Sequence, residues 1–261
     1  MNLELEGKIA IITGGSRGIG LETAVQLAKE GAKIAIAARN KEQLEEAASI
    51  IAETTGASCL TIVANVTLEQ DCKRIIEETA AYYGGRIHIL VNNAGTSAAQ
   101  PFEQVGADAW QQDLDLKLFG AIHCSRYVIP YMREAGGGSI VNVTASMAKT
   151  PPASSLPTTV SRAAGMALTK AMSKDLGPDN IRVNTVGIGL IRSHQIEQKW
   201  KSSAPHLTWE QFASDPKHGV PLGRIGRTEE AAKVIAFLVS GAASYVTGTS
   251  VNIDGGAAPA L

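Results

Sequence analysis

Ile9-Ala-Ile-Ile-Thr-Gly-Gly-Ser-Arg-Gly-Ile-Gly20 is the stretch that decides the fold of this chain. A short apolar run, typical of a buried strand, leads into a turn with glycines at positions 14, 15, 18 and 20, and a helical pattern follows at once. Glycine is needed where a backbone turns sharply and then approaches a ligand more closely than a Cβ would allow. The start of the helix offers free N–H groups and a positive dipole to a phosphate. Strand, turn and helix together predict a dinucleotide-binding turn rather than an ordinary glycine-rich one.

The same turn also contains Gly14-x-Ser16-x-Gly18, which is the spacing of the nucleophile elbow in hydrolases. An elbow needs an earlier strand and loop to supply the N–H groups of an oxyanion hole, and the stretch before this turn is too short for both. We therefore interpret Ser16 as a phosphate ligand and not as a nucleophile.

Composition and charge exclude several classes of function. Of the 261 residues 44% are hydrophobic, as in ordinary globular proteins, and the formal net charge of −1 offers no basic surface to nucleic acid or to an anionic membrane. We find neither a signal-peptide pattern nor an apolar run of membrane-spanning length. Cys59, Cys72 and Cys124 are widely spaced, which favours buried thiols over a disulfide or a metal site. We expect a cytoplasmic protein that acts on a small molecule, with no metal, nucleic-acid or membrane partner.

Strands alternate with helices along the whole chain, which predicts parallel βαβ units in one domain spanning residues 1–261. After the first strand, the expected strands are 33–38, 58–64, 87–91, 139–143, 181–186 and 249–253. The expected helices after the first are 41–54, 68–83, 107–133 (with a bend), 161–176 and 228–240. The sequence thus predicts an α/β protein, a doubly wound Rossmann fold with a parallel seven-stranded sheet.

Ligands of such sheets bind beyond the C-terminal ends of the strands, so the residues that follow the strands should share one rim. We expect the rim to bind the cofactor through Gly14, Ser16, Arg17, Gly18, Ile19, Gly20, Arg39, Asn40, Asn65, Val66, Asn93, Ala94 and Gly95.

The end of the second strand indicates which cofactor is bound. An NAD site usually carries an acidic residue there, which bonds the ribose hydroxyls. This strand instead ends in Ala37-Ala38-Arg39-Asn40, and the first acid is Glu42. Arg39 and Arg17 are either solvated surface charges or a clamp for a 2′-phosphate through charge-assisted hydrogen bonds. The missing acid favours the clamp, and we expect NADP(H) rather than NAD(H).

Motifs along nearly the whole chain resemble those of the short-chain dehydrogenase/reductase family. They are Thr13-Gly-Gly-Ser-Arg-Gly-Ile-Gly20, Asn92-Asn-Ala-Gly95, Arg182-Val-Asn184 leading to Gly189-Leu-Ile191, and Thr247-Gly248 leading to Asp254-Gly-Gly256. The resemblance, to 3-oxoacyl-reductase-like members in particular, implies a Rossmann fold and a nicotinamide cofactor whose nicotinamide end lies at Gly189 and Ile191. It also implies a homotetramer, or a homodimer, built through the long helices after strands four and five.

The resemblance fails at the residues that carry the family's reductase chemistry, which are a Tyr-x-x-x-Lys pair, a Ser and an Asn. In that chemistry a phenol with a lowered pKa donates the proton, and the Ser hydroxyl polarises the carbonyl. Counting back from the Arg-Val-Asn motif, the Lys position falls on Arg162 and the Tyr position on Thr158, and no tyrosine occurs from 132 to 244. The Asn position falls on Lys117, and the Ser position on Ala145 with Ser146 beside it.

Four residues are candidates for the altered catalytic set. Arg162 can hold the cofactor ribose and place a charge beside a carbonyl, although its pKa is too high for it to release a proton. Thr158 can donate a hydrogen bond but is a poor acid. Lys117 is either a proton source with a pKa lowered by burial or by Arg162, or a surface lysine paired with Asp113 at i,i+4. Ser146 is either the carbonyl-polarising group or a turn hydroxyl.

Residues 192–221 occupy the position of the family's substrate lid. Their aromatic residues, Trp200, Trp209 and Phe212, either wall an apolar pocket or pin the lid to the body of the protein. The histidines of this segment have no metal-ligand spacing, and we assign them structural or surface roles.

Three functions fit this sequence. The first is an NADP(H)-dependent oxidoreductase that acts on a small carbonyl, alcohol or activated alkene through a non-standard catalytic set, because hydride transfer depends above all on positioning. The second is a catalytically silent NADP(H)-binding sensor or partner subunit, which the fold alone does not exclude. The third is a lyase or isomerase on the same fold.

Overall fold

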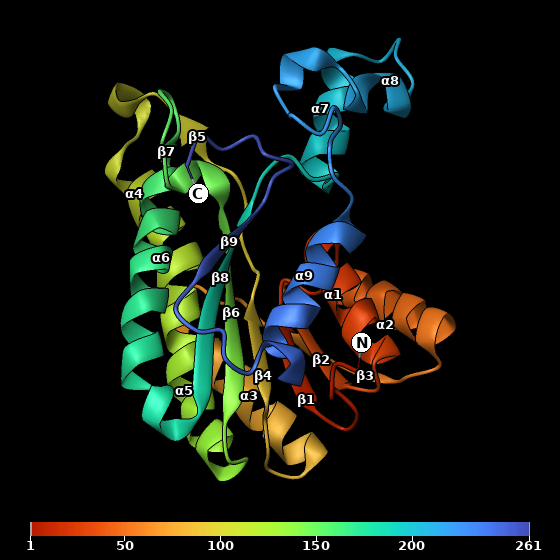
Figure 1. The fold of residues 1–261 in the computed structure, drawn as a ribbon, viewed down its shortest axis with the longest axis vertical. Helices are drawn as coiled ribbons and strands as arrows, with labels where there is room; N and C mark the ends of the chain where they lie inside the picture. The colour runs from red at the N-terminus through yellow and green to blue at the C-terminus, as the bar shows by residue number, and fades with distance from the viewer. Residues whose placement is uncertain (1, 261) are drawn as a thin grey trace.

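A parallel sheet forms the centre of the computed structural model, which describes residues 2–260 (Figure 1). Its seven strands are β1 Ile9–Thr13, β2 Lys33–Ala38, β3 Cys59–Val63, β4 Ile89–Asn92, β6 Gly138–Ala145, β8 Ile181–Ile188 and β9 Ser250–Ile253. They lie in the order β3-β2-β1-β4-β6-β8-β9, and every neighbouring pair is parallel. The order reverses between β1 and β4, which confirms the predicted doubly wound Rossmann fold.

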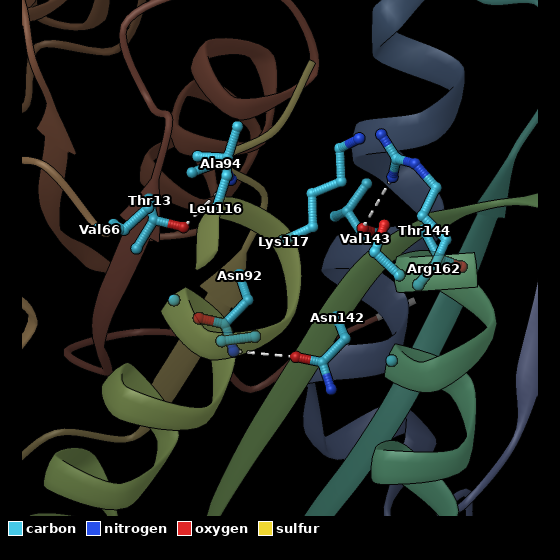
Figure 2. A pocket seen from close by; sticks show the side chains of 14 residues that line it. Thr13, Val66, Asn92, Ala94, Leu116, Lys117, Asn142, Val143, Thr144 and Arg162 are labelled. Atoms are coloured by element: carbon cyan, nitrogen blue, oxygen red, sulfur yellow. Dashed lines mark hydrogen bonds between the residues drawn. The ribbon is translucent and has the colours of Figure 1, made fainter. Parts of the chain in front are cut away.

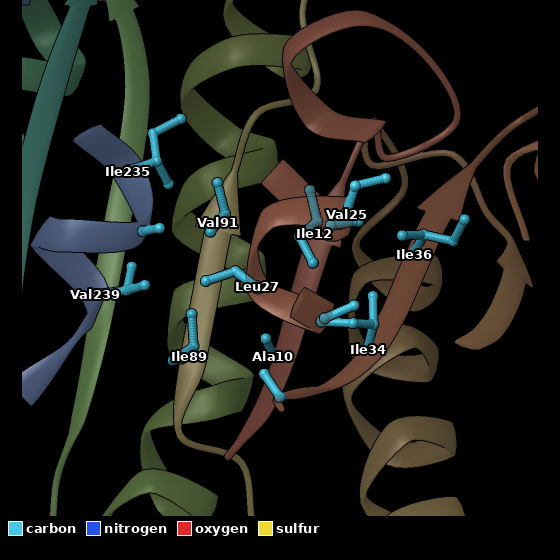
Figure 3. Close-up of a cluster of buried hydrophobic side chains, with 14 of the residues drawn as sticks. Ala10, Ile12, Val25, Leu27, Ile34, Ile36, Ile89, Val91, Ile235 and Val239 are labelled. Carbon is cyan, nitrogen blue, oxygen red and sulfur yellow. The ribbon is translucent and has the colours of Figure 1, made fainter. Parts of the chain in front are cut away.

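The apolar runs of the central strands are explained by burial on both faces of the sheet. In β1, Ala10 and Ile12 belong to one buried cluster, whereas Ile9 and Ile11 belong to the other. Figure 3 shows the first cluster, in which Leu27 packs over the strands from a helix. Alternation along one strand thus supplies two cores, one beneath each layer of helices.

Helices cover both faces of this sheet (Figure 1). The first buried cluster contains residues of α1 Gly18–Lys29, α2 Lys41–Thr55 and α9 Thr228–Val239. The second contains residues of α3 Glu69–Tyr83 and α5 Gly120–Glu134, and Met172 of α6 Thr158–Asp175 packs against it. Short 3₁₀ turns lie between these elements; they are η1 Phe102–Gln104, η3 Ser146–Ala148, η4 Gly177–Asp179 and η6 Gly241–Ala243.

The long helix predicted over 107–133, with a bend at no stated position, is interrupted at residues 115–119. It consists of α4 Ala107–Leu114, a single π-helical turn η2 Asp115–Phe119, and then α5. A π turn inserts a residue into the helical repeat and redirects the side chains around it. Lys117 lies in this turn.

Helix α6 starts at Thr158, three residues before the predicted start at 161. Thr158 and Arg162 are therefore one turn apart on the same helix. A two-residue antiparallel pair, β5 Ala99–Gln100 with β7 Leu156–Pro157, joins the loop after β4 to the start of α6. This pair was not predicted.

The lid segment holds α7 His194–Ser203, α8 Trp209–Ala213 and η5 Pro216–His218, and projects away from the sheet (Figure 1). Trp200 packs edge-on against Trp209 with 5.6 Å between ring centroids, and Phe212 belongs to the same small cluster as Ile225 at the base of the segment. His218 bonds the carbonyl of Phe212 at 2.7 Å, a structural role. These contacts all join residues 190–225, so the aromatic residues pack the segment on itself, and the contacts favour neither the pocket wall nor the pinning to the body of the protein.

Two further expectations concern membranes and thiols. Within residues 2–260, no helix has the length and apolar character needed to cross a bilayer. The three cysteines are free thiols, and Cys72 and Cys124 are buried, but Cys59 is only partly buried because it begins the edge strand β3.

Candidate functional site

The glycine turn after β1 has the geometry of a phosphate-binding turn. Gly14 and Gly18 have φ angles of +64° and +57°, which lie in the left-handed region that favours glycine. A Cβ on Gly20 would lie 2.3 Å from the carbonyl oxygen of Gly14, and a Cβ on Gly14 would lie 2.9 Å from Cα of Ala94. Substitution by any larger residue would therefore open the turn. Its last residues form the N-terminus of α1, where the backbone N–H groups are free.

Asn93, which we expected to bind cofactor, holds this turn in place. Its side-chain amide donates to the carbonyl oxygens of Thr13 at 3.0 Å and Gly14 at 3.1 Å. In return, the Thr13 hydroxyl accepts from the backbone N–H groups of Asn93 at 3.1 Å and Ala94 at 3.2 Å. These hydrogen bonds join the end of β1 to the end of β4, and the side chain of Asn93 stabilises the glycine turn.

A cleft of about 530 Å³ runs along the C-terminal ends of β1, β2, β3 and β4. Eight of the predicted cofactor residues line it, together with others from the same strand ends. The full lining is Gly14, Ser16, Ala37, Ala38, Arg39, Asn40, Gln43, Ala64, Asn65, Val66, Ala94, Gly95, Thr96 and Leu116. The lining contains no carboxylate, and Arg39 is its only cation. Its polarity therefore suits an anionic group at the end formed by β2.

Some predicted cofactor residues lie outside this cleft. Arg17 is exposed at the start of α1 and, like Gly18, Ile19 and Gly20, does not line it. On the other side of the site, Gly189 donates its N–H to the Ile253 carbonyl at 3.0 Å, and Ile191 pairs with Gly226. Asn40 lines the cleft and also caps α2, since its side chain accepts from the N–H of Gln43 at 2.8 Å.

Beside the cleft, four side chains from α4, η2 and α6 form a buried polar cluster. The Lys117 ammonium bonds both a carboxylate oxygen of Asp113 and the hydroxyl of Thr158, the latter with 2.6 Å between Nζ and Oγ1. Ser161 donates to the other oxygen of Asp113 at 2.5 Å. The side chains of Lys117 and Asp113 are only 4% and 3% exposed. The Asp113 pairing predicted for Lys117 is therefore present, but the lysine is not on the surface.

Arg162 completes the site from the next turn of α6. Its guanidinium donates to the carbonyl of Val143 at 3.3 Å (Figure 2). The charged ends of Arg162 and Lys117 point toward each other in Figure 2. Burial lowers the pKa of Arg162. Burial also lowers the pKa of Lys117, the charge of Arg162 adds to this effect, and Asp113 opposes it.

Ser146 is placed differently from the other candidate catalytic residues. Strand β6 continues through Ala145, which pairs with Ile188, and Ser146 is buried at the start of η3. A Cβ on Gly187 would meet the backbone of Ser146 at 3.2 Å. Thr158, Lys117 and Arg162 are brought together, whereas Ser146 makes no hydrogen bond to them within residues 2–260.

The sequence reasoning missed a buried polar network beneath this cluster. The amide of Asn92 donates to Asn142 at 2.9 Å (Figure 2). The amide of Asn142 donates in turn to the Thr169 hydroxyl at 2.9 Å. Asn92 and Asn142 line an internal cavity of about 20 Å³, which has room for about one water molecule, together with Lys117. Polar residues inside otherwise apolar strands were the available signal, because buried amides persist only where partners exist.

Comparisons with known proteins agree with this architecture. Residues 14–258 match a protein-family model described as enoyl-(acyl carrier protein) reductase. The chain is 35% identical over 256 residues to the 3-oxoacyl-(acyl-carrier-protein) reductase FabG of Thermotoga maritima, covering 97% of this chain and 99% of that protein.

Two solved structures are similar over almost their full length. L-sorbose reductase of Gluconobacter frateurii, complexed with NADPH and L-sorbose, has a TM-score of 0.93 and 32% identity, with all of both chains covered. A short-chain oxidoreductase of Pseudomonas aeruginosa PAO1, described as containing an atypical catalytic center, has a TM-score of 0.94 and 32% identity, with 99% of this chain and 100% of that chain covered.

The fold, the glycine turn and the cleft define a Rossmann oxidoreductase with a nicotinamide cofactor. The chain belongs to the short-chain dehydrogenase/reductase family.

Proposed function

We propose that this protein is an NADP(H)-dependent oxidoreductase in which Lys117 supplies the proton that a tyrosine supplies elsewhere in the family. The observation that carries the proposal is the 2.6 Å contact between Lys117 Nζ and Thr158 Oγ1. Thr158 stands at the family's tyrosine position, and the ammonium reaches it from the facing helix. A protonated donor is thereby kept at the place where the family's reaction needs one.

The residues present fit NADP(H). Gly14 and Gly20 keep the turn tight, because a Cβ on either would strike backbone atoms. The start of α1 offers its N–H groups to a pyrophosphate, and Arg39 lines the cleft where no carboxylate does. A bound NADPH would supply the hydride. A 2′-phosphate would suit Arg39, whereas the ribose hydroxyls of NAD would lack their usual acid there. Support also comes from the similar L-sorbose reductase, whose structure holds NADPH.

In the reductive direction, hydride reaches the carbonyl carbon while the Lys117 ammonium donates a proton to the oxygen. Thr158 orients that oxygen by a hydrogen bond, and the charge of Arg162 stabilises the developing alkoxide and holds the cofactor ribose. The neutral lysine then recovers a proton from solvent. Lowered pKa values make Lys117 a better acid than an exposed lysine, whereas Arg162 keeps its charge.

The first experiment is titration of the purified protein with NADPH and NADH, followed by nicotinamide fluorescence. We expect binding that is selective for NADPH, and then NADPH consumption with some members of a panel of small carbonyl compounds. Binding without consumption of any carbonyl would favour the silent sensor or partner subunit, for which the loss of the family's Tyr and Ser is the supporting observation. If the protein bound neither nucleotide, the proposal that it is an oxidoreductase would be wrong.

The expected homotetramer or homodimer is also a proposal. Three large apolar side chains in η1, η2 and α6 are exposed: Phe102, Phe119 and Val160 are 72%, 40% and 44% exposed. Exposed apolar residues that gather on one region often mark an interface. Light scattering coupled to gel filtration measures the mass directly, and a monomer would contradict the proposal.

A further inference from the structure

Among the residues that the structure describes, Arg162 is a cation without an ion-pair partner. Its one hydrogen bond within residues 2–260 goes to the neutral carbonyl of Val143, and it forms no ion pair there. A guanidinium has five N–H donors, so most of its bonding capacity is unused. A partly buried charge in this condition is costly unless a ligand completes it.

The neighbouring charges offset Arg162 only in part, through the attraction of Asp113. Lys117 is a second buried cation, and Asp113, the carboxylate of this cluster, is already bonded to Lys117 and Ser161. Two cations therefore face one carboxylate. The cluster carries an excess positive charge, and that excess lies on Arg162.

The side chains of Arg162 and Lys117 border the same space beside Gly95. A Cβ on Gly95 would lie 3.6 Å from Nη2 of Arg162 and 3.7 Å from Cγ of Lys117. Gly95 also lines the cofactor cleft, so this space adjoins the place where a nicotinamide would meet its substrate. A substrate bound there meets a proton donor and an unpaired guanidinium side by side (Figure 2).

We infer that the substrate carries a carboxylate on the carbon next to its reacting carbonyl, so that the enzyme interconverts 2-oxo acids and 2-hydroxy acids. This inference rests on the proposed function and adds its substrate class. Arg162 binds the carboxylate through paired N–H groups, and Lys117 with Thr158 bonds the carbonyl oxygen. Hydride from NADPH adds to the carbonyl carbon, the Lys117 proton goes to the oxygen, and the products are the 2-hydroxy acid and NADP⁺.

A neutral substrate would leave the charge of Arg162 unmatched. The hydroxyls of a cofactor ribose accept hydrogen bonds from a guanidinium but bring no negative charge. A methyl ester of the same 2-oxo acid keeps the shape and the carbonyl but loses the anion. The acid and its ester are therefore a matched pair that isolates the role of charge.

The test compares the NADPH-dependent reduction of 2-oxobutanoate and phenylglyoxylate with that of their methyl esters. We expect kcat/KM to be at least about tenfold higher for the acids, as one charge-assisted pair provides. Arg162→Met should remove this preference, and Arg162→Lys should retain part of it. Arg126→Met, which removes an exposed arginine of α5, is the matched control and should leave the preference unchanged.

A second readout needs no turnover. Oxamate, an unreactive analogue of pyruvate, should bind the NADPH-loaded protein in calorimetric titrations, and Arg162→Met should weaken this binding at least about tenfold. Nucleotide affinity and circular dichroism are recorded for each variant, so that loss of the fold or of NADPH is recognised.

The outcomes separate the two proposals. Equal kcat/KM values for the esters and the acids would overturn the carboxylate inference but would leave the proposed oxidoreductase function standing. Oxamate binding that depends on Arg162, without reduction of any carbonyl, would support the carboxylate site while overturning the proposed reaction. Failure of oxamate to bind, with no preference for acids, would overturn the inference.

Discussion

Lys117 Nζ lies 2.6 Å from Thr158 Oγ1, although the two residues stand on facing segments and are 41 positions apart in the chain. The π turn η2 directs the lysine inward, and helix α6 presents the threonine at its first residue. The short threonine side chain leaves room that the long lysine fills. In the function that we propose, the Lys117 ammonium takes the place of the proton donor that the family carries at position 158.

The pH dependence of reduction follows from the charge on Lys117. Burial first, and then the charge of Arg162, lower the pKa of Lys117 below the ordinary lysine value of 10.5. Reduction requires the ammonium form, so kcat should be constant at low pH and fall as the pH rises through this lowered pKa. The measurement is kcat against pH under saturating NADPH.

Two variants separate the proton of Lys117 from its charge. Lys117→Met should lower kcat about 100-fold or more, as the loss of a general acid does. Lys117→Arg keeps the charge but releases no proton. Its kcat should therefore fall as far as that of Lys117→Met, and the decrease of kcat with rising pH should disappear. Lys174→Met, on the exposed side of α6, serves as the control. Full activity in Lys117→Arg would mean that the charge alone matters.

Cofactor preference should depend on Arg39. Its position in the lining of the cleft, among residues without a carboxylate, makes it the expected partner of a 2′-phosphate. Arg39→Asp removes the charge-assisted bonds and restores an acid for ribose hydroxyls, so the NADPH/NADH affinity ratio should fall about tenfold or more. Arg17→Asp, outside the cleft, is the comparison and should change the ratio less. An unchanged ratio in Arg39→Asp would exclude the phosphate clamp.

The fold and the glycine turn could be predicted because local sequence determines them. Apolar strands followed by helical patterns specify parallel βαβ units, and Gly20 is required by a close contact with the Gly14 carbonyl within one short segment. The role of Asn93 was missed, because its bonds to the turn join segments about 80 positions apart. Tertiary pairing of this kind leaves little signal in a single sequence.

The candidate catalytic cluster was predicted only in part for a related reason. The spacing of Asp113 and Lys117 indicated an ion pair on one helix, and this pair exists. Whether the pair faces solvent or α6 depends on the π turn, and the sequence pattern does not reveal such an insertion. The position of Ser146 depends on where β6 ends. The sequence pattern predicted an end at 143, and the strand ends at Ala145.

The start of helix α9 provides a prediction about stability. Glu230 accepts two hydrogen bonds from Arg224, at 2.6 and 2.8 Å, and one from the N–H of Arg227 at 2.7 Å. These bonds, led by that of Arg224, lower the pKa of Glu230 from 4.5 to about 2. Because the folded pKa is depressed, the stabilisation is present above about pH 4.5 and is lost as the pH falls toward about 2.

Glu230→Gln should therefore lower the free energy of unfolding by about 1 kcal/mol near neutral pH, since the pair is partly exposed and screened. Urea unfolding of both proteins over a range of pH measures the difference. The two curves should converge as the pH falls. A difference that persisted at low pH would show that the effect does not come from the carboxylate charge.

The last prediction concerns rebuilding the family's catalytic set. Thr158 is 2% exposed and its hydroxyl already contacts the Lys117 ammonium, so a phenol at this position has no space while the lysine remains. Thr158→Tyr with Arg162→Lys should then give no gain on neutral ketones. Adding Lys117→Asn and Ala145→Ser frees the space and supplies the missing groups, and activity on neutral ketones should rise about 100-fold over the double variant. The measurement is kcat/KM for a neutral ketone in the wild type and both variants, with nucleotide affinity as the control for folding. Equal gains in the two variants would mean that Lys117 moves aside, and that its contact with Thr158 does not limit the chemistry of the site.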